Sequence, residues 1–248
     1  MPAEFAIELE NVEKTYPGGH VALRGVSLRV AEGETLALLG PSGCGKTTTL
    51  KLVNRLLSPT SGRVFVRGRD VSRVDPVELR RGIGYVVQNA GLFPHLTAKG
   101  NAEIVPRLLG WSHSRRSRRI GELFELLGLG PELLSRYPAE LSGGQRQRVG
   151  LARALAADPP ILLMDEPFGA LDPPTRERLQ LEFAELRQRL RKTVVLVTHD
   201  VREAFFLADR VAVLEEGRLV QYGTPEEIRR SPRTPLVDAF TKSERGPS

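Results

Sequence analysis

The stretch Gly40-Pro41-Ser42-Gly43-Cys44-Gly45-Lys46-Thr47 fits G-x-x-x-x-G-K-[ST], the pattern of a phosphate-binding loop. The apolar run 35–39 before it predicts a buried strand, and a helix is expected from about Lys46 to Leu57. Glycines let backbone N–H groups turn toward phosphate oxygens, and the positive end of the helix dipole points at the same anion. The sequence therefore predicts a nucleotide-binding loop that extends from Gly40 to Thr48.

Three residues of this loop have separate expected roles. Lys46 adds a full positive charge at the β and γ phosphates, and the Thr47 hydroxyl is expected to ligate Mg²⁺. Cys44, near a helix N-terminus, has no base beside it in the sequence, so we interpret it as a small loop filler rather than a nucleophile.

A second acidic element follows farther along the chain. The apolar run 161–164 ends in Asp165 and Glu166, which places two carboxylates at the tip of a buried strand. Asp165 is expected to hold Mg²⁺ through its water shell, and Glu166 to polarise an attacking water molecule.

The pattern on either side of these motifs predicts an α/β fold. Alternating segments at 5–10, 22–30 and 63–67 predict antiparallel strands, and the stretch from about 89 to 158 has helical spacing. We expect one domain over 1–248, with an α/β P-loop core of the RecA-like kind at about 1–88 and 159–230. An antiparallel β subdomain belongs to that core, an α-helical subdomain is inserted at about 89–158, and a short tail follows at 231–248.

Composition narrows the function classes. The chain has 248 residues, is 40% hydrophobic, and carries a net charge of +6. Its single cysteine excludes an intramolecular disulfide and a cysteine-built zinc site. No apolar run approaches about 18 residues, and the N-terminus lacks the order of a signal peptide, so a cytoplasmic protein is expected. The basic stretch from Arg107 to Arg119 is interpreted as a solvated helix face, with anionic lipid or nucleic acid as the alternatives.

The segment Leu141-Ser142-Gly143-Gly144-Gln145-Arg146-Gln147-Arg148 identifies the family that the chain resembles. Leu-Ser-Gly-Gly-Gln is the signature motif of the ATP-binding-cassette (ABC) ATPases. The resemblance covers about residues 5–230. Tyr16 matches the aromatic residue that stacks on adenine, Gln88 the Q-loop glutamine, and His199 the switch histidine. Gly169-Ala170-Leu171-Asp172 matches the D-loop, with glycine where serine is commoner, which puts one hydrogen bond across the dimer in doubt.

The resemblance implies an ATPase that uses ATP and Mg²⁺ in a head-to-tail homodimer. Each nucleotide would lie between one subunit's phosphate-binding loop and the partner's signature motif, a two-fold arrangement. The implied catalytic residues are Glu166, His199, Gln88 and Lys46, and the implied metal ligands are Thr47, Gln88 and Asp165. The nucleotide would be bound by Tyr16, Gly40, Pro41, Ser42, Gly43, Cys44, Gly45, Lys46, Thr47, Thr48, Ser142, Gly143, Gly144, Gln145 and Asp172.

A single cassette without a membrane span or a coiled coil looks like the ATPase subunit of a bacterial importer. Such a subunit lies at the cytoplasmic face of the plasma membrane, works with membrane permease subunits and, indirectly, with an extracytoplasmic solute-binding protein, and needs no nucleic acid. The stretch 88–97 resembles the Q-loop region of importer ATPases, where Leu92 and Phe93 would line a groove for a permease helix. The alternative interpretation is that both are ordinary core residues.

Segments 53–57, 80–89 and 100–104 resemble the ATPases of glycine betaine, choline and related osmoprotectant importers. None of these residues would touch the solute. Two alternatives stay open: import of another solute (a metal, oxyanion, polyamine or amino acid), or a soluble ATPase that acts on nucleic acid or ribosomes. The sequence leaves undetermined the solute, the partner chains, the transport stoichiometry, the regulation and the role of the basic stretch.

Overall fold

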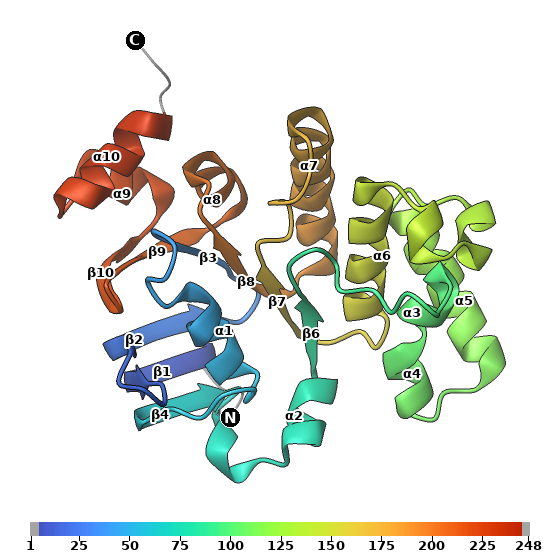
Figure 1. The fold of residues 1–248 in the computed structure, drawn as a ribbon, viewed down its shortest axis with the longest axis horizontal. Coiled ribbons are helices and arrows are strands. Elements are labelled where there is room, and N and C mark those ends of the chain that lie inside the picture. The colour runs from blue at the N-terminus through green and yellow to red at the C-terminus, as the bar shows by residue number, and fades with distance from the viewer. Residues whose placement is uncertain (1–4, 245–248) are drawn as a thin grey trace. The chain divides into compact units, whose positions relative to one another are not determined.

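The computed structural model describes residues 5–244, which form two compact units. Unit 1 consists of residues 1–80 and 190–248, and unit 2 of residues 81–189. Figure 1 shows unit 1 in blue and in orange to red, and unit 2 from blue-green to gold. The segment 1–4, part of the N-terminus that argued against a signal peptide, lies outside the described residues. Unit 2 is wider than the predicted helical segment because it also includes two strands and a long helix.

Unit 1 contains an antiparallel sheet in the order β2-β1-β4-β5. The strands are β1 (Phe5–Thr15), β2 (Val21–Ala31), β4 (Ser61–Val66) and β5 (Arg69–Asp70). Apolar and polar residues alternate because one face of each strand is buried, and Leu9 lies opposite both Leu28 and Val64. The predicted antiparallel strands are thus present.

A second set of strands in unit 1 has the order β10-β9-β3-β8. These are β3 (Thr35–Leu39), β8 (Thr193–Thr198), β9 (Arg210–Glu215) and β10 (Arg218–Gly223). β3 is parallel to β8 and β9, and all five of its residues are buried, which explains its continuous apolar sequence. β9 and β10 form the predicted hairpin, whose turn residues Glu216 and Gly217 have positive φ. The helical elements of unit 1 include α1 (Lys46–Val53), η1 (Val71–Arg73), α2 (Pro76–Arg81) and α8 (Val201–Leu207). The end of α2 lies at the boundary between the two units.

The C-terminal segment differs from the expected tail. After α9 (Pro225–Arg230), which begins with the predicted Thr224 cap, residues Pro235–Glu244 form a further helix, α10. Val237 of α10 is fully buried in a cluster with Ile228 and Phe205, and the Arg229 guanidinium pairs with Glu244 at 2.8 Å. The sequence pattern did not indicate this helix because its burial depends on packing against α8 and α9. Residues 245–248 lie outside the described residues.

Unit 2 combines two parallel strands with helices. β6 (Ile83–Val86) pairs with β7 (Ile161–Asp165), and α7 (Pro173–Leu190) follows. Between the strands lie α3 (Ala98–Ala102), α4 (Ile104–Leu108), α5 (His113–Leu126), η2 (Pro131–Ser135), η3 (Pro138–Glu140) and α6 (Gly143–Leu155). Ile120, Leu123 and Phe124 of α5 are buried, as their helical spacing predicts. The predicted fold class, an α/β protein with antiparallel strands and an inserted helical segment, is confirmed.

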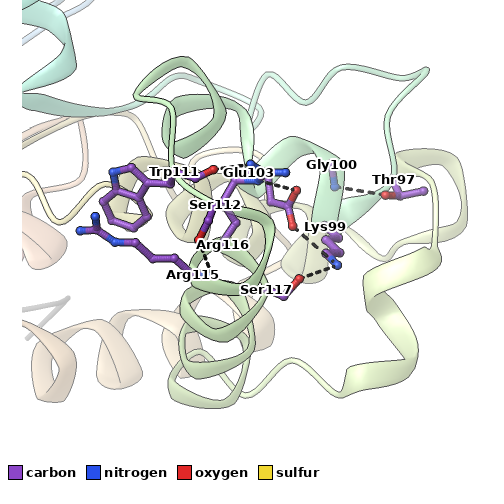
Figure 2. A network of polar contacts seen from close by, with 9 residues as sticks. All are labelled: Thr97, Lys99, Gly100, Glu103, Trp111, Ser112, Arg115, Arg116 and Ser117. Atoms are coloured by element: carbon purple, nitrogen blue, oxygen red, sulfur yellow. Dashed lines mark hydrogen bonds and ion pairs between the residues drawn. The ribbon is translucent and has the colours of Figure 1, made fainter.

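Part of the basic stretch has a structural role in unit 2. Figure 2 shows Glu103 between Lys99 and Arg116, with nitrogen-to-oxygen distances of 3.6 and 3.4 Å. Arg116 also donates to the Trp111 carbonyl, and Arg115 stacks 3.6 Å from the centre of the Trp111 ring. Arg119 donates to the carbonyls of Leu155 and Ala156 as well, so Arg115, Arg116 and Arg119 of this stretch make contacts within unit 2 rather than facing solvent alone.

Candidate functional site

The predicted site residues fall into two groups, one in each unit. Unit 1 holds the phosphate-binding loop and its neighbours, and unit 2 holds the acidic pair and the signature motif. In unit 1 these are Tyr16, Gly40–Thr48 and His199; in unit 2 they are Gln88, Ser142–Gln145, Asp165, Glu166 and Asp172.

The phosphate-binding loop requires glycine at two positions. At Gly40, φ is +154° and an added Cβ would lie 2.2 Å from the Leu214 carbonyl oxygen. At Gly45, φ is +106° and a Cβ would lie 2.5 Å from Leu23 Cδ2. Any side chain at these positions would therefore collide with the strands on which the loop rests.

The N-terminus of α1 lies in the phosphate-binding loop. Gly45 occupies the N-cap position, and no side chain caps the helix. The first N–H groups of a helix lack partners within the helix and carry its positive dipole end. The start of α1 thus carries a positive dipole end without a side-chain cap, where the sequence predicts phosphate binding.

Lys46 places a buried positive charge in the same loop. It is 6% exposed, and its Nζ donates to the carbonyl oxygens of Gly40 at 2.6 Å and Pro41 at 2.8 Å. The Cys44 sulfur lies 3.8 Å away, and burial raises the pKa of the Cys44 thiol, which keeps it neutral. Since these acceptors carry no full charge, the residues fit a polyanionic ligand such as a nucleotide phosphate.

Two more predicted residues lie beside the loop in unit 1. The hydroxyls of Tyr16 and Thr48 are hydrogen-bonded at 3.1 Å, and the Tyr16 ring stacks on His20 with centroids 6.2 Å apart. His199 is exposed and follows Thr198, the residue that pairs with Leu39 in the parallel strands β8 and β3. His199 and Gly40 therefore leave neighbouring strands at the same edge.

In unit 2, strand pairing brings Gln88 and Glu166 together. Val86 lies opposite Met164 in the parallel pair β6–β7, so the two chains leave the strands side by side. Gln88 Nε2 donates to Glu166 Oε2 at 3.4 Å. Glu166 has φ of +46°, a left-handed conformation that costs about 1–3 kcal/mol in a residue other than glycine and is frequent at functional sites.

Asp165 is buried and contacts a residue that the sequence analysis did not select. Tyr85 on β6 donates a hydrogen bond to Asp165; burial first, and then this carboxylate, raise the pKa of Tyr85 to about 12. The phenol therefore stays protonated and helps to hold Asp165. Tyr85 sits inside an apolar strand sequence, which gives no signal of this contact.

The signature motif forms a complete helix cap. Ser142 Oγ accepts from the Gln145 amide at 3.2 Å, and Gln145 Oε1 accepts from the Ser142 amide at 2.8 Å, which is a capping box at the start of α6. Gly144 is buried against α7, where an added Cβ would meet Thr175 Cγ2 at 3.0 Å. One of the predicted signature glycines therefore has a packing role as well.

Asp172 occupies a similar position at α7. Its carboxylate accepts from the Thr175 amide at 3.2 Å, and this hydrogen bond holds the pKa of the Asp172 carboxyl below its ordinary value. The side chain is exposed and is charged at neutral pH.

The stretch after Gln88 is held by two residues that sequence reasoning missed. Arg153 of α6 donates to the carbonyls of Ala90 at 2.6 Å and Gly91 at 2.7 Å. Asn101, fully buried, donates to the carbonyl of Phe93 and accepts from its amide. Phe93 itself is 46% exposed, so it is not a core residue; Leu92 is half-buried.

Residues 5–244 contain neither a membrane-spanning helix nor a metal-binding cluster of side chains. No helix within residues 5–244 has the length and apolar character needed to cross a membrane. The same residues contain no group of three His, Cys, Asp or Glu side chains arranged to hold a metal ion. The predicted Mg²⁺ ligands, a hydroxyl, an amide and one carboxylate, fit a metal that is held largely by nucleotide phosphates.

Known proteins support the family resemblance. The ABC transporter family model matches residues 23–169. The glycine betaine/carnitine/choline transport ATP-binding protein OpuCA of Bacillus subtilis (strain 168) is 55% identical over 239 residues, covering 96% of this chain and 63% of that protein. The glycine betaine uptake system ATP-binding protein YehX of Escherichia coli (strain K12) is 47% identical over 94% of this chain and 76% of its own length.

Among solved structures, the dimeric post-hydrolysis state of the ATP-binding cassette MJ0796 bound to ADP and Pi has a TM-score of 0.79 and 38% identity. The match covers 88% of this chain and 98% of that one. Because OpuCA is matched over 63% of its length, this chain spans less than two thirds of that relative. The family match and these identities confirm the resemblance, and the chain belongs to the ABC transporter family.

Proposed function

We propose that this chain is the ATP-hydrolysing subunit of an ABC importer, which couples ATP binding and hydrolysis to solute uptake. The phosphate-binding loop carries the proposal: within residues 5–244, Lys46 is a buried cation held by neutral acceptors, and α1 begins without a side-chain cap. A nucleotide polyphosphate satisfies both needs at once, since it supplies negative charge and acceptor oxygens.

The chain's residues would divide the work on ATP as follows. Tyr16 stacks on adenine, while the loop Gly40–Thr48 binds the phosphates and Lys46 contacts the β and γ groups. Thr47, Gln88 and Asp165 would hold Mg²⁺, which supplies charge neutralisation at the phosphates. Glu166 takes a proton from the attacking water, and His199 and Gln88 contact the γ-phosphate and that water.

The functional form that we propose is a head-to-tail homodimer. The exposed side chains of Ser142 and Asp172 support this, because each caps a helix and leaves a polar surface at its N-terminus. MJ0796, which is similar over most of this chain, is dimeric with ADP and Pi. In the dimer, Ser142, Gly143, Gly144 and Gln145 of one copy would complete the nucleotide site of the other.

We further propose that the chain acts at the cytoplasmic face of the plasma membrane, bound to permease subunits. Phe93 is exposed although it is a large aromatic residue, and Asn101 and Arg153 hold its loop in place. An exposed, rigidly held aromatic side chain fits the contact with a permease helix. The α/β core and the helical insertion then belong to a single ATPase domain, an extracytoplasmic solute-binding protein takes part indirectly, and no nucleic acid is needed.

The proposed solute is a quaternary-amine osmoprotectant such as glycine betaine or choline. Support comes from the names of OpuCA and YehX, which are 55% and 47% identical to this chain. The solute itself would be bound by other subunits, so no residue of this chain is assigned to it.

The test compares two activities of the wild type and Lys46→Ala. The variant should lose hydrolysis of Mg-ATP as a purified protein and uptake of labelled glycine betaine in cells that lack a redundant system. Normal hydrolysis by the variant would contradict the role of the phosphate-binding loop. Lost hydrolysis with unchanged betaine uptake, at confirmed expression, would leave the ATPase and remove betaine as the solute.

A further inference from the structure

Unit 2 contains a cavity of about 270 Å³ that the nucleotide chemistry does not use. It lies among the ends of β6 and β7, the last turn of α5, and helices α6 and α7. The residues of its lining that matter for binding are Gln147, Arg148, Met164, Phe168, Leu179 and Phe183.

The walls of this cavity are mainly apolar. Phe168 and Phe183 meet edge to face with ring centroids 6.1 Å apart, and both are nearly fully buried. Met164 and Leu179 add further buried surface. A volume just below the range of about 300–1,000 Å³ that is usual for ligand pockets suits a small apolar molecule.

Two hydrogen-bond donors in the lining are buried and unsatisfied. Gln147 is 8% exposed, and its Nε2 finds no acceptor within residues 5–244. The same holds for Arg148 Nε, although the other nitrogens of Arg148 donate to the Gly128 carbonyl at 3.2 Å and pair with Glu182 at 2.7 Å. Leaving a buried donor unsatisfied is unfavourable, so an acceptor brought by a ligand would be stabilising.

The charges around the cavity select the kind of acceptor. Two arginines, Arg148 and Arg189, face three glutamates, Glu125, Glu182 and Glu185, which leaves a net charge of −1. Arg148 is also neutralised by its ion pair with Glu182. An anionic ligand would be repelled at this rim, whereas a carbonyl oxygen accepts hydrogen bonds without carrying a charge.

We propose that this cavity is a binding site for a small, neutral, mostly apolar molecule with a carbonyl-type acceptor. The acceptor takes the hydrogen bond from Gln147 Nε2, and the apolar body packs against Phe168 and Phe183.

The site is placed to act on the ATPase. Met164 precedes Asp165 on β7, Pro167 follows Glu166, and Gln147 lies on the helix that Ser142 caps. A ligand in the cavity therefore contacts the supports of the acidic pair and of the signature motif. This regulatory consequence rests on the proposed ATPase function, whereas binding itself does not.

The binding test uses three probes with the same number of non-hydrogen atoms: acetophenone, isopropylbenzene and benzoate. Binding to the full chain is measured by ligand-observed NMR titration without nucleotide. Acetophenone should bind about 2- to 10-fold more tightly than isopropylbenzene, the range expected for one net hydrogen bond. Benzoate should bind most weakly because of the negative rim. Absence of binding, equal affinities, or preferred binding of benzoate would overturn the proposal.

Variants locate the binding. Gln147→Met keeps a side chain of similar size and removes the donor, so acetophenone should lose its advantage while isopropylbenzene still binds. Leu126→Trp, at a half-open position of the lining, should block all probes. Leu181→Trp is the matched control, since Leu181 is 52% exposed on α7 outside the cavity. Retained acetophenone preference in Gln147→Met, or unchanged binding to Leu126→Trp, would show that the site lies elsewhere.

The regulatory step is then read from ATP hydrolysis by the purified protein. Saturating acetophenone should change the rate of the wild type and of Leu181→Trp, but not of Leu126→Trp. An unchanged rate with proven binding would overturn the regulatory consequence. If the purified wild-type protein hydrolyses no ATP but still binds acetophenone, the proposed ATPase function is contradicted and the proposed binding site is not.

Discussion

Two helices of this protein begin within glycine-containing motifs, and their N-termini are built in opposite ways. α1 follows Gly45 and has no side-chain cap, whereas α6 follows Ser142 and has a complete capping box with Gln145. The loop before α1 also encloses the buried cation of Lys46, and the turn before α6 leaves Ser142 exposed.

The difference separates a site that is incomplete without its ligand from one that is complete alone. At α1 no side chain caps the N-terminus, and the Lys46 charge is met by neutral acceptors, so an anion would supply the opposite charge that the loop lacks. At α6 the capping box pairs the amides of Ser142 and Gln145, so the turn would already be ordered when it met a partner copy's nucleotide in the proposed dimer. Pre-ordering lowers the entropy cost of association.

Of the substitutions that test this comparison between the two helix N-termini, Gly45→Ala is expected to have the largest effect. Gly45→Ala should lower the free energy of unfolding by roughly 2–5 kcal/mol, through left-handed strain and a collision with Leu23 Cδ2 and the Ala22 carbonyl. Gly43→Ala is the control: φ there is +80°, but no atom lies within 4 Å of the added Cβ, so about 1–2 kcal/mol is expected. Equal losses in chemical denaturation would show that close packing does not shape the loop.

The next effect concerns ligand binding. Lys46→Ala should weaken binding of ATP by about 10- to 100-fold, which corresponds to the roughly 1.5–3 kcal/mol of a hydrogen bond to a charged group. Lys51→Ala, which removes a charge from the last turn of the same helix, should change the affinity little. The ATP affinity of both variants is measured by calorimetric titration. Similar losses of affinity would show that Lys46 contributes only a nonspecific positive charge.

A smaller effect is expected at the self-capped helix. Ser142→Ala removes the cap of α6 and should cost about 1 kcal/mol of stability without any nucleotide present. Ser42→Ala, in the exposed part of the phosphate-binding loop, should leave the melting temperature unchanged in the same experiment. If the two substitutions destabilise equally, the contrast between the two N-termini is wrong.

The smallest effect is a difference in chemical reactivity at Cys44. Its folded-state pKa is raised, mainly by burial, so less thiolate is present at pH 8 than in a free cysteine. Alkylation by iodoacetamide should therefore be slower than for the same chain in denaturant, and should accelerate as pH rises. ATP should slow it further. Fast alkylation of the folded chain at pH 8 would indicate an open loop.

Local patterns were sufficient for much of the fold. The alternation in 5–10, the apolar run 35–39 and the helical spacing near Ile120 each record the periodicity of one element, and the structure has these elements. The helix α10 was missed since Val237 is buried in a cluster with residues of α8, α9, β3 and β9, a relation that no local pattern contains.

The residues of the candidate site also divide into those that a local sequence pattern indicates and those that only a tertiary contact reveals. Lys46, Glu166, His199 and the signature motif stand out because strand, loop and residue type follow one another directly in the chain. Tyr85, Asn101 and Arg153 were missed, as each acts through a contact between segments: Arg153 holds carbonyls that lie 62 and 63 positions earlier.

The amino-acid order alone was enough to determine the family and to predict the phosphate-binding loop and the residues proposed to handle ATP, because these depend on short motifs of fixed spacing. Tertiary structure alone decided which helix N-terminus has a side-chain cap, and how Gln88 reaches Glu166. It also decided that a cavity with two unsatisfied donors lies against Met164 and Pro167, the neighbours of the acidic pair. Those features depend on burial and on distances between remote segments. Both quantities appear only when the chain is folded.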